Sequence, residues 1–129
     1  MTQDKLNIWF LEIGEPLPRE REQRPHFIGS LSQYLARHGH KVTWWTSSFS
    51  HSPKKHFVDA DAIDVDGQRQ VIYLKGPGYR RNISLARIQH QRHFAQQFLD
   101  TATQKSPPDL VFTCVPTIEN AVAASQYAK

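Results

Sequence analysis

The strongest constraint on the fold is an alternation of apolar runs and helical periodicity along the chain. The run Leu6–Ile13 is almost continuously apolar and ends at Gly14, which is typical of a strand buried on both faces of a parallel sheet. A polar loop follows, and from Pro25 to Gly39 apolar residues recur at helical spacing. Val42–Thr46 is then β-branched and aromatic, as strands often are. This order predicts a βαβ unit with a right-handed crossover.

The rest of the chain continues the alternation after one excursion. Ser47–Phe57 is polar and predicts a loop. Ala62–Val65 and Val71–Leu74 flank an Asp-Gly turn signal and predict a hairpin-like strand pair. Three further elements complete the predicted order: a helix from Asn82 or Ser84 to about Lys105, a buried strand at Leu110–Val115, and a helix at Ile118–Lys129.

These elements predict an α/β fold, with a Rossmann-like, three-layer αβα arrangement around a mainly parallel sheet. We expect the strands at Leu6, Val42 and Leu110 to be neighbours, with helices on both faces of the sheet. The helical positions expected to face the core are Phe27, Leu31, Tyr34, Leu35 and His38 in the first helix, Leu85, Ile88, Ala95, Phe98, Leu99 and Ala102 in the second, and Ala121, Val122, Ala124 and Ala128 in the last.

Length and pattern together predict one domain. A chain of 129 residues can bury a single hydrophobic core. The alternation stops after the last helix, without the parallel strand that would come next. We therefore expect residues 1–129 to form a single truncated domain.

Charge and cysteine content narrow the class of protein. The formal net charge is +4, and the basic residues are scattered rather than gathered in one block. A basic surface suits phosphate groups, nucleic acid or an anionic membrane, and it is also found on ordinary solvated surfaces. The single cysteine, Cys114, has no partner for an internal disulfide. The sequence start lacks a signal-peptide pattern, so we expect a cytoplasmic protein.

Several common site signatures are missing. The six glycines form neither a G-x-G-x-x-G nor a G-x-x-x-x-G-K-[ST] pattern, which argues against a dinucleotide-binding or P-loop role. Only His90 and His93 have helical spacing, and they have no carboxylate companion, so we expect no metal site. We also expect no cofactor, and we expect Cys114 to act as a small hydrophobe in a buried strand. No aromatic-basic stacking motif supports nucleic-acid binding.

The candidate site lies where the predicted parallel strands end. In open parallel α/β sheets, ligands bind beyond the carboxyl ends of the strands. Basic side chains in the loops there would attract a negatively charged ligand, and polar ones could bond its hydroxyl groups. A solvated mixed-charge loop is the alternative reading for Arg19 and its neighbours. The candidate cleft residues are Gly14, Glu15, Arg19, Arg24, Thr46, Ser47, His51, Lys55 and Thr117, with Lys54 adding charge.

Three stretches carry a resemblance to a known family. They are Gly14–Pro18, reading GEPLP; Leu35–Ser47, reading LARHGHKVTWWTS; and Gly76–Ser84, reading GPGYRRNIS. In this order the chain resembles the N-terminal domain of the GT-B-fold glycosyltransferases of family 4, in a branch acting in bacterial surface-polysaccharide assembly. One departure is that many relatives carry a Gly-Gly pair in the first loop, whereas Glu15 and Pro16 follow Gly14 here.

The resemblance implies a function. Such enzymes move a sugar from a nucleotide-sugar donor to a glycan or lipid-linked acceptor, as in lipopolysaccharide synthesis, retaining the anomeric configuration and generally without a metal. The N-terminal domain mostly holds the acceptor, and the second domain holds the nucleotide diphosphate; by this resemblance we expect that C-terminal domain to lie outside residues 1–129. By this resemblance Gly14 and Glu15 line the cleft floor, with Arg24, His51 and Lys55 on the acceptor side. The resemblance also implies peripheral association with the inner face of the plasma membrane. This chain alone is expected to be inactive.

A second reading stays open at this point. The chain could be a stand-alone α/β binding module for a phosphorylated ligand or a protein partner.

Overall fold

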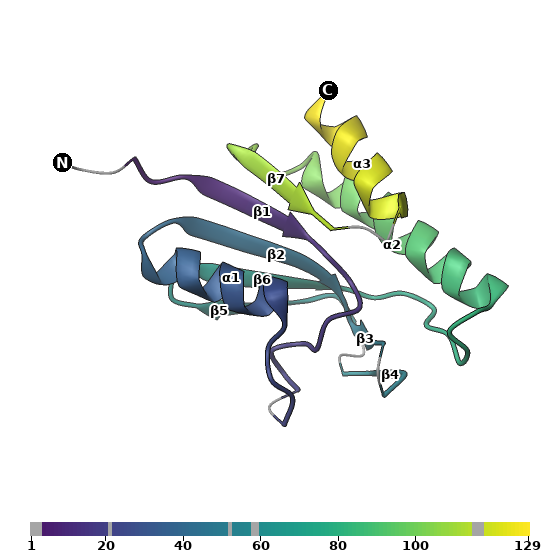
Figure 1. Ribbon diagram of the computed structural model, residues 1–129. Coiled ribbons are helices and arrows are strands. Elements are labelled where there is room, and N and C mark those ends of the chain that lie inside the picture. The colour runs from purple at the N-terminus through teal and green to yellow at the C-terminus, as the bar shows by residue number, and fades with distance from the viewer. Residues whose placement is uncertain (1–3, 21, 52, 58–59, 115–117) are drawn as a thin grey trace.

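A five-stranded, mainly parallel sheet forms the centre of the computed structural model, which describes residues 4–20, 22–51, 53–57, 60–114 and 118–129. The strand order is β5-β6-β2-β1-β7 (Figure 1). All neighbouring pairs are parallel except β5 with β6. The strands are β1 (Asn7–Leu11), β2 (Lys41–Ser47), β5 (Ala62–Asp66), β6 (Arg69–Leu74) and β7 (Leu110–Thr113).

The three strands predicted to be neighbours are adjacent. Ile8 of β1 pairs in register with Val42 of β2 on one side and with Leu110 of β7 on the other. The predicted hairpin is also present, with β5 and β6 joined through Gly67, whose φ of +61° suits a glycine. The mixed α/β class and the mainly parallel sheet are therefore confirmed.

Helix α1 (Phe27–Arg37) packs against one face of the sheet. Its buried residues are Ile28, Gly29, Ser32 and Ala36. The predicted face is partly wrong, because Phe27 and Tyr34 are each 59 % exposed. Small side chains let the helix approach the sheet closely, and the bulky aromatic residues lie at the flanks of the contact.

Helices α2 (Leu85–Ala102) and α3 (Ile118–Ala128) pack against the other face (Figure 1). Trp9 and Trp45 of the sheet meet Phe98 of α2, with their ring centroids 6.1 and 5.2 Å from that of Phe98. Tyr127 of α3 stacks on Trp9 at 5.3 Å. These aromatic contacts fix both helices on this face.

The predicted faces of these two helices also need correction. Leu85 and Ile88 are exposed, as is Val122 of α3. The first turn of α2 extends past the carboxyl ends of the strands (Figure 1), which leaves its apolar side chains exposed. The buried positions are His90, Phe94, Ala95, Phe98 and Ala102 in α2, and Asn120, Ala123 and Ala124 in α3.

The segment predicted to be a loop after β2 contains regular structure. Two short strands, β3 (Phe49–Ser50) and β4 (Lys55–His56), form a separate antiparallel pair. Two-residue strands are too short to show a period in the sequence.

Two further points complete the fold. Cys114 lies just after β7 and is half-buried, which corrects the prediction of a buried strand residue. No helix in the described ranges is long and apolar enough to cross a membrane.

Candidate functional site

The carboxyl ends of β1, β2, β6 and β7 lie at one edge of the sheet, because these strands are parallel. We call it the carboxyl edge. The loops that follow these strands bring Glu15, Arg24, Ser47 and His51 to this edge. Thr117, the remaining loop candidate after β7, lies outside the described residues.

Glu15 is engaged with helix α1. Its carboxylate accepts hydrogen bonds from the backbone N–H groups of Ile28 at 2.8 and 3.0 Å and of Gly29 at 3.2 Å. A carboxylate at this end satisfies free N–H groups and interacts favourably with the helix dipole. Gly14 precedes it with φ +107°, which a side-chain-bearing residue rarely adopts. Glu15 therefore caps α1 and is not a free ligand of the cleft.

A second carboxyl group at this edge was missed by sequence reasoning. Glu12 is buried directly after β1, and its backbone carbonyl accepts a hydrogen bond from Trp44 Nε1 at 3.0 Å. Burial and the nearby charge of Glu15 raise the Glu12 pKa to about 8, although a hydrogen bond from the Cys114 backbone partly offsets them. Glu12 is consequently protonated at neutral pH. In the sequence, only its position inside the apolar run Leu6–Ile13 indicates that Glu12 is buried.

The loops after β1 and β2 are tied together by Glu20. Its buried carboxylate accepts hydrogen bonds from the Leu17 backbone N–H at 2.5 Å and from Ser50 Oγ of β3 at 2.8 Å. Because Phe49 is the neighbour of Ser50, this bond links the first loop to the aromatic groups described below. The two loops are therefore joined at this point.

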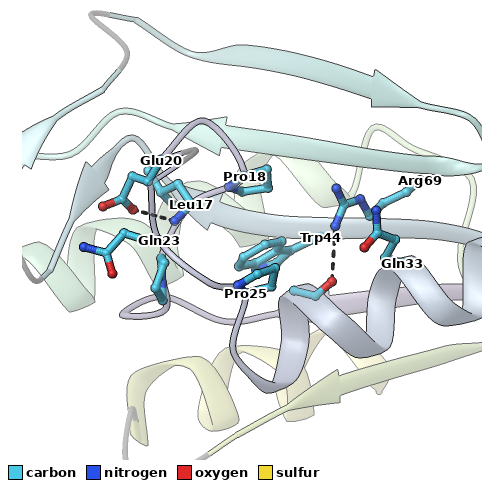
Figure 2. Close-up of a pocket in the computed structure, with 10 residues that line it drawn as sticks. Leu17, Pro18, Glu20, Gln23, Pro25, Gln33, Trp44 and Arg69 are labelled. Carbon is cyan, nitrogen blue, oxygen red and sulfur yellow. Dashed lines mark hydrogen bonds between the residues drawn. The ribbon is translucent and has the colours of Figure 1, made fainter.

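A cavity of about 280 Å³ opens between the first loop and α1 (Figure 2). Its wall combines apolar groups with Glu20, Gln23, Gln33 and Arg69. The Arg69 side chain is buried and donates to the Gly29 carbonyl at 3.3 Å, as the dashed line in Figure 2 shows. The apolar lining is Pro16, Leu17, Pro18, Pro25 and Trp44, with Gly29.

Arg19 and Lys55 come together on the outer side of the first loop, where they line a hollow of about 400 Å³. Arg19 is paired with Asp64 of β5 through two contacts of 2.7 Å, which hold the pKa of that carboxyl below its usual range. Lys55 Nζ lies 4.9 Å from the centre of the Phe57 ring. The charge of Arg19 is thus neutralised by Asp64, and Lys55 contributes a positive charge to the hollow.

Ser47 belongs to a group on the other face of the sheet. Gly78 donates its backbone N–H to His90 Nδ1 at 3.0 Å, so the proton of the neutral imidazole lies on Nε2, which donates to Ser47 Oγ at 3.2 Å. Burial, with smaller effects from His56 and His93, lowers the His90 pKa to about 4. His90 therefore stays neutral and fixes the end of β2.

The glycines of the β6–α2 loop allow this arrangement. A side-chain carbon on Gly76 would lie 2.8 Å from the His90 ring, and one on Gly78 would lie 2.8 Å from Phe49. The Gly76-Pro77-Gly78 stretch thus lets the loop pass close to two rings, a packing role that the sequence pattern alone does not reveal.

His51 forms a polar pair with Tyr79. Its Nδ1 makes a short hydrogen bond with the Tyr79 hydroxyl. Phe49 of β3 packs against Tyr79, with the ring centroids 4.9 Å apart. Burial and the charges of Arg87 and Lys54 lower the His51 pKa, while burial raises the pKa of Tyr79. At neutral pH both side chains are uncharged, half-buried hydrogen-bonding groups.

The predicted residues are thus divided between the two faces of the sheet. Thr46 is fully buried and follows Trp44 by two residues, so it shares the α1 face, whereas Ser47 faces α2. Arg24 is exposed just before α1. Within the described part of the chain, no group of three His, Cys, Asp or Glu residues could hold a metal ion.

Fold and site together define a mixed α/β protein with a polar carboxyl edge, built from carboxyl, imidazole, phenol and basic groups. Comparison with known proteins adds nothing to this class: no protein-family model matches the sequence, and no curated protein matches it significantly.

Proposed function

We propose that this chain is the acceptor-side, Rossmann-like domain of a nucleotide-sugar-dependent glycosyltransferase of the GT-B fold. Its reaction is the transfer of a sugar to a glycan or lipid-linked acceptor in bacterial surface-polysaccharide synthesis. In such an enzyme the second domain holds the nucleotide, and the carboxyl edge of this domain faces it across the cleft.

One observation carries the proposal: the three stretches of sequence that resemble the family all reach the carboxyl edge. Gly14–Pro18 is the loop after β1, Leu35–Ser47 runs from α1 through β2 to that edge, and Gly76–Ser84 joins β6 to α2 there. Each stretch is separated from the next by about thirty residues or fewer along the chain. A ligand site shared by all three would explain why the resemblance to the family is concentrated in them.

The chemistry of the edge also suits the proposed acceptor. His51 and Tyr79 offer neutral hydrogen-bonding groups, which suit the hydroxyls of a sugar, and the buried ring of Phe49 supports Tyr79 from behind. Lys54 and Lys55 each line a neighbouring hollow and offer positive charge to a phosphate group of the acceptor. Because the leaving diphosphate is neutralised by the second domain, we expect acceptor binding without turnover by this domain alone.

Calorimetry tests the proposal directly. A short-chain prenyl-diphosphate sugar, soluble without vesicles, is titrated into the chain, and a nucleotide-sugar is titrated separately. We expect saturable binding of the acceptor that His51→Ala weakens about three- to tenfold, the loss of one hydrogen bond. His38→Ala is the matched control, because His38 is exposed at the end of α1 away from the carboxyl edge.

Two results would contradict the proposal. Equal binding of prenyl diphosphate with and without its sugar would favour the binding module for phosphorylated ligands. Release of free nucleotide at rates normal for glycosyltransferases would show that this domain does not depend on a second one.

A further inference from the structure

The cavity between the first loop and α1 has no part in the proposed function. Its lining comes from that loop, from α1, from β2 and from β6, and it does not include His51 or Tyr79. Arg69 is the first residue of β6, so it lies toward the end of the sheet opposite the carboxyl edge. The cavity of about 280 Å³ is therefore a space distinct from the candidate acceptor site.

Arg69 brings a buried positive charge to this cavity. The residue is only 8 % exposed, and a guanidinium stays charged at any ordinary pH. Its Nη1 donates to the Gly29 carbonyl and to Ser32 Oγ, both at 3.3 Å, which is long for a hydrogen bond. Among the residues that the structure describes, Nε has no hydrogen-bond partner, and Nη2 has only the Asp66 carboxylate at 3.6 Å.

The bonding of Arg69 is thus incomplete on the side away from α1. A guanidinium carries five N–H donors, and a buried charge is costly unless acceptors surround it. Asp66 compensates little, because its side chain is 70 % exposed and its contact is longer than a hydrogen bond. The Arg69 end of the cavity is therefore in need of an acceptor, and an anionic ligand supplies one.

Gln33 of α1 adds a neutral hydrogen-bonding group at the same end. Figure 2 shows the Gln33 amide beside the Arg69 guanidinium, one from the helix and the other from the sheet. A carboxylate has two oxygens, so it can accept from the guanidinium and from the amide together. The pair of donors matches the planar shape and the single charge of that group.

Proline rings form the accessible apolar wall of the cavity. Pro16, Pro18 and Pro25 line it, and the fully buried ring of Trp44 lies beneath. Because the proline ring fixes the backbone φ angle, these walls lose little freedom when a ligand enters. The space next to the charged end is thus preformed for an apolar molecular body.

The charges of the lining limit the ligand to one negative charge. Glu20 lies at the end of the cavity away from Arg69 (Figure 2), and its carboxylate is occupied by Leu17 and Ser50. Among the lining residues Arg69 is the single cation. A second acidic group on the ligand would meet Glu20 without a compensating cation, which disfavours dianions such as phosphate.

We infer that this cavity is a binding site for a small monocarboxylic acid with an apolar body. The carboxylate binds Arg69 and Gln33, and the apolar body lies against the proline rings. The inference does not rest on glycosyl transfer, because the buried, incompletely bonded cation and the preformed apolar space carry it.

A titration followed by ¹H–¹⁵N NMR tests the inference with three probes of one shape. They are benzoate, its neutral analogue benzamide, and phenylphosphonate, each added to the chain without any sugar. We expect benzoate to shift the amides of Gly29 and Gln33 and the indole N–H of Trp44 in a saturable way. Benzamide should bind at least about tenfold more weakly, because it lacks the charge that Arg69 recognises. The amides of His51 and Tyr79 should stay in place, which separates this site from the proposed acceptor site.

Variants of the two donors identify the groups that bind the carboxylate. Arg69→Gln should weaken benzoate binding about tenfold or more, the loss of a charge-assisted hydrogen bond. Arg69→Lys keeps the charge but not the planar fork, and should weaken binding about three- to tenfold. Gln33→Ala should weaken it about threefold. Because Gln33 is half-exposed on a helix, this variant tests the site even if removing the buried Arg69 charge unfolds the chain.

Matched controls lie on the other face of the sheet. Arg92→Gln removes an exposed charge from α2, and Gln126→Ala removes an exposed amide from α3. Both variants should bind benzoate like the unaltered chain, and circular dichroism checks that every variant folds.

Three outcomes would overturn the inference. One is a full benzoate titration that leaves the amides of Gly29 and Gln33 unshifted. Another is equal binding of benzamide and benzoate, or unchanged benzoate binding by the folded Arg69 and Gln33 variants, which would make Arg69 only an anchor between β6 and α1. The third is tighter binding of phenylphosphonate than of benzoate, which would assign the cavity to a phosphate group.

Discussion

Glu12 shows how a single buried carboxyl group couples stability to pH. Its folded-state pKa of about 8 lies above the ordinary value of 4.5 given for a glutamate. Between these two values the folded state holds a proton that the unfolded state has lost. Stability therefore falls as pH rises through this window and levels off above the folded-state pKa.

Glu12→Gln should remove this dependence. The amide cannot ionise, so the variant should gain stability relative to the unaltered chain as pH rises from 5 to 8, by a few kcal/mol at most. Urea unfolding at a series of pH values measures the difference. Glu22→Gln is the matched control, because Glu22 is an exposed carboxylate and its loss should leave the pH profile unchanged. A profile for Glu12→Gln parallel to that of the unaltered chain would show that Glu12 titrates normally.

At the scale of elements, the Glu15 carboxylate fixes the start of α1. His26 precedes the helix without a side-chain cap, and the first turn contains no acidic residue. Glu15 reaches these N–H groups from thirteen residues earlier in the chain. The loop after β1 and the helix are therefore held in one geometry by a single side chain.

Glu15→Gln should destabilise the protein by about 1 kcal/mol, because the charge–dipole interaction and the paired acceptors at the helix start are lost. It should also lower the pKa of Glu12, since the Glu15 charge is one cause of its elevation. Chemical unfolding measures the first effect, and NMR titration of the Glu12 side chain measures the second. An unchanged Glu12 pKa together with unchanged stability would rule out this role for Glu15.

The sequence predicts elements better than it predicts their faces. The apolar runs in β1 and β2 are long enough to mark buried strands, and α2 is capped by Ser84, one of the two residues predicted for its start. The buried side of α1 consists of small residues such as Gly29 and Ser32, which a search for apolar periodicity passes over. The contacts of a helix with a sheet decide its buried face, and those contacts are non-local.

The candidate site was harder to predict for the same reason. Parallel topology is enough to bring Glu15 and His51 to one edge. Their partners are distant in sequence: Glu15 bonds Ile28, and Arg19 bonds Asp64 forty-five residues away. Each pairing changes what the residue can offer a ligand, and spacing along the chain does not reveal it.

The whole molecule has two well-packed sheet faces and one polar edge. Aromatic clusters bury Trp9, Trp44 and Trp45 under the helices, so these faces are occupied by the core. The carboxyl edge collects hydrogen-bonding groups from the loops after β1, β2 and β6. The central claim is that this edge binds the acceptor sugar.

Mapping the bound acceptor by NMR tests that claim most directly. A two-dimensional ¹H–¹⁵N spectrum of the chain is recorded while the short-chain prenyl-diphosphate sugar is added. The account predicts that the shifted amides lie in the loops after β1, β2 and β6, including His51 and Tyr79. It is contradicted if the shifts lie along β7 and α3 instead, or if saturating ligand leaves the amides of the carboxyl edge unchanged.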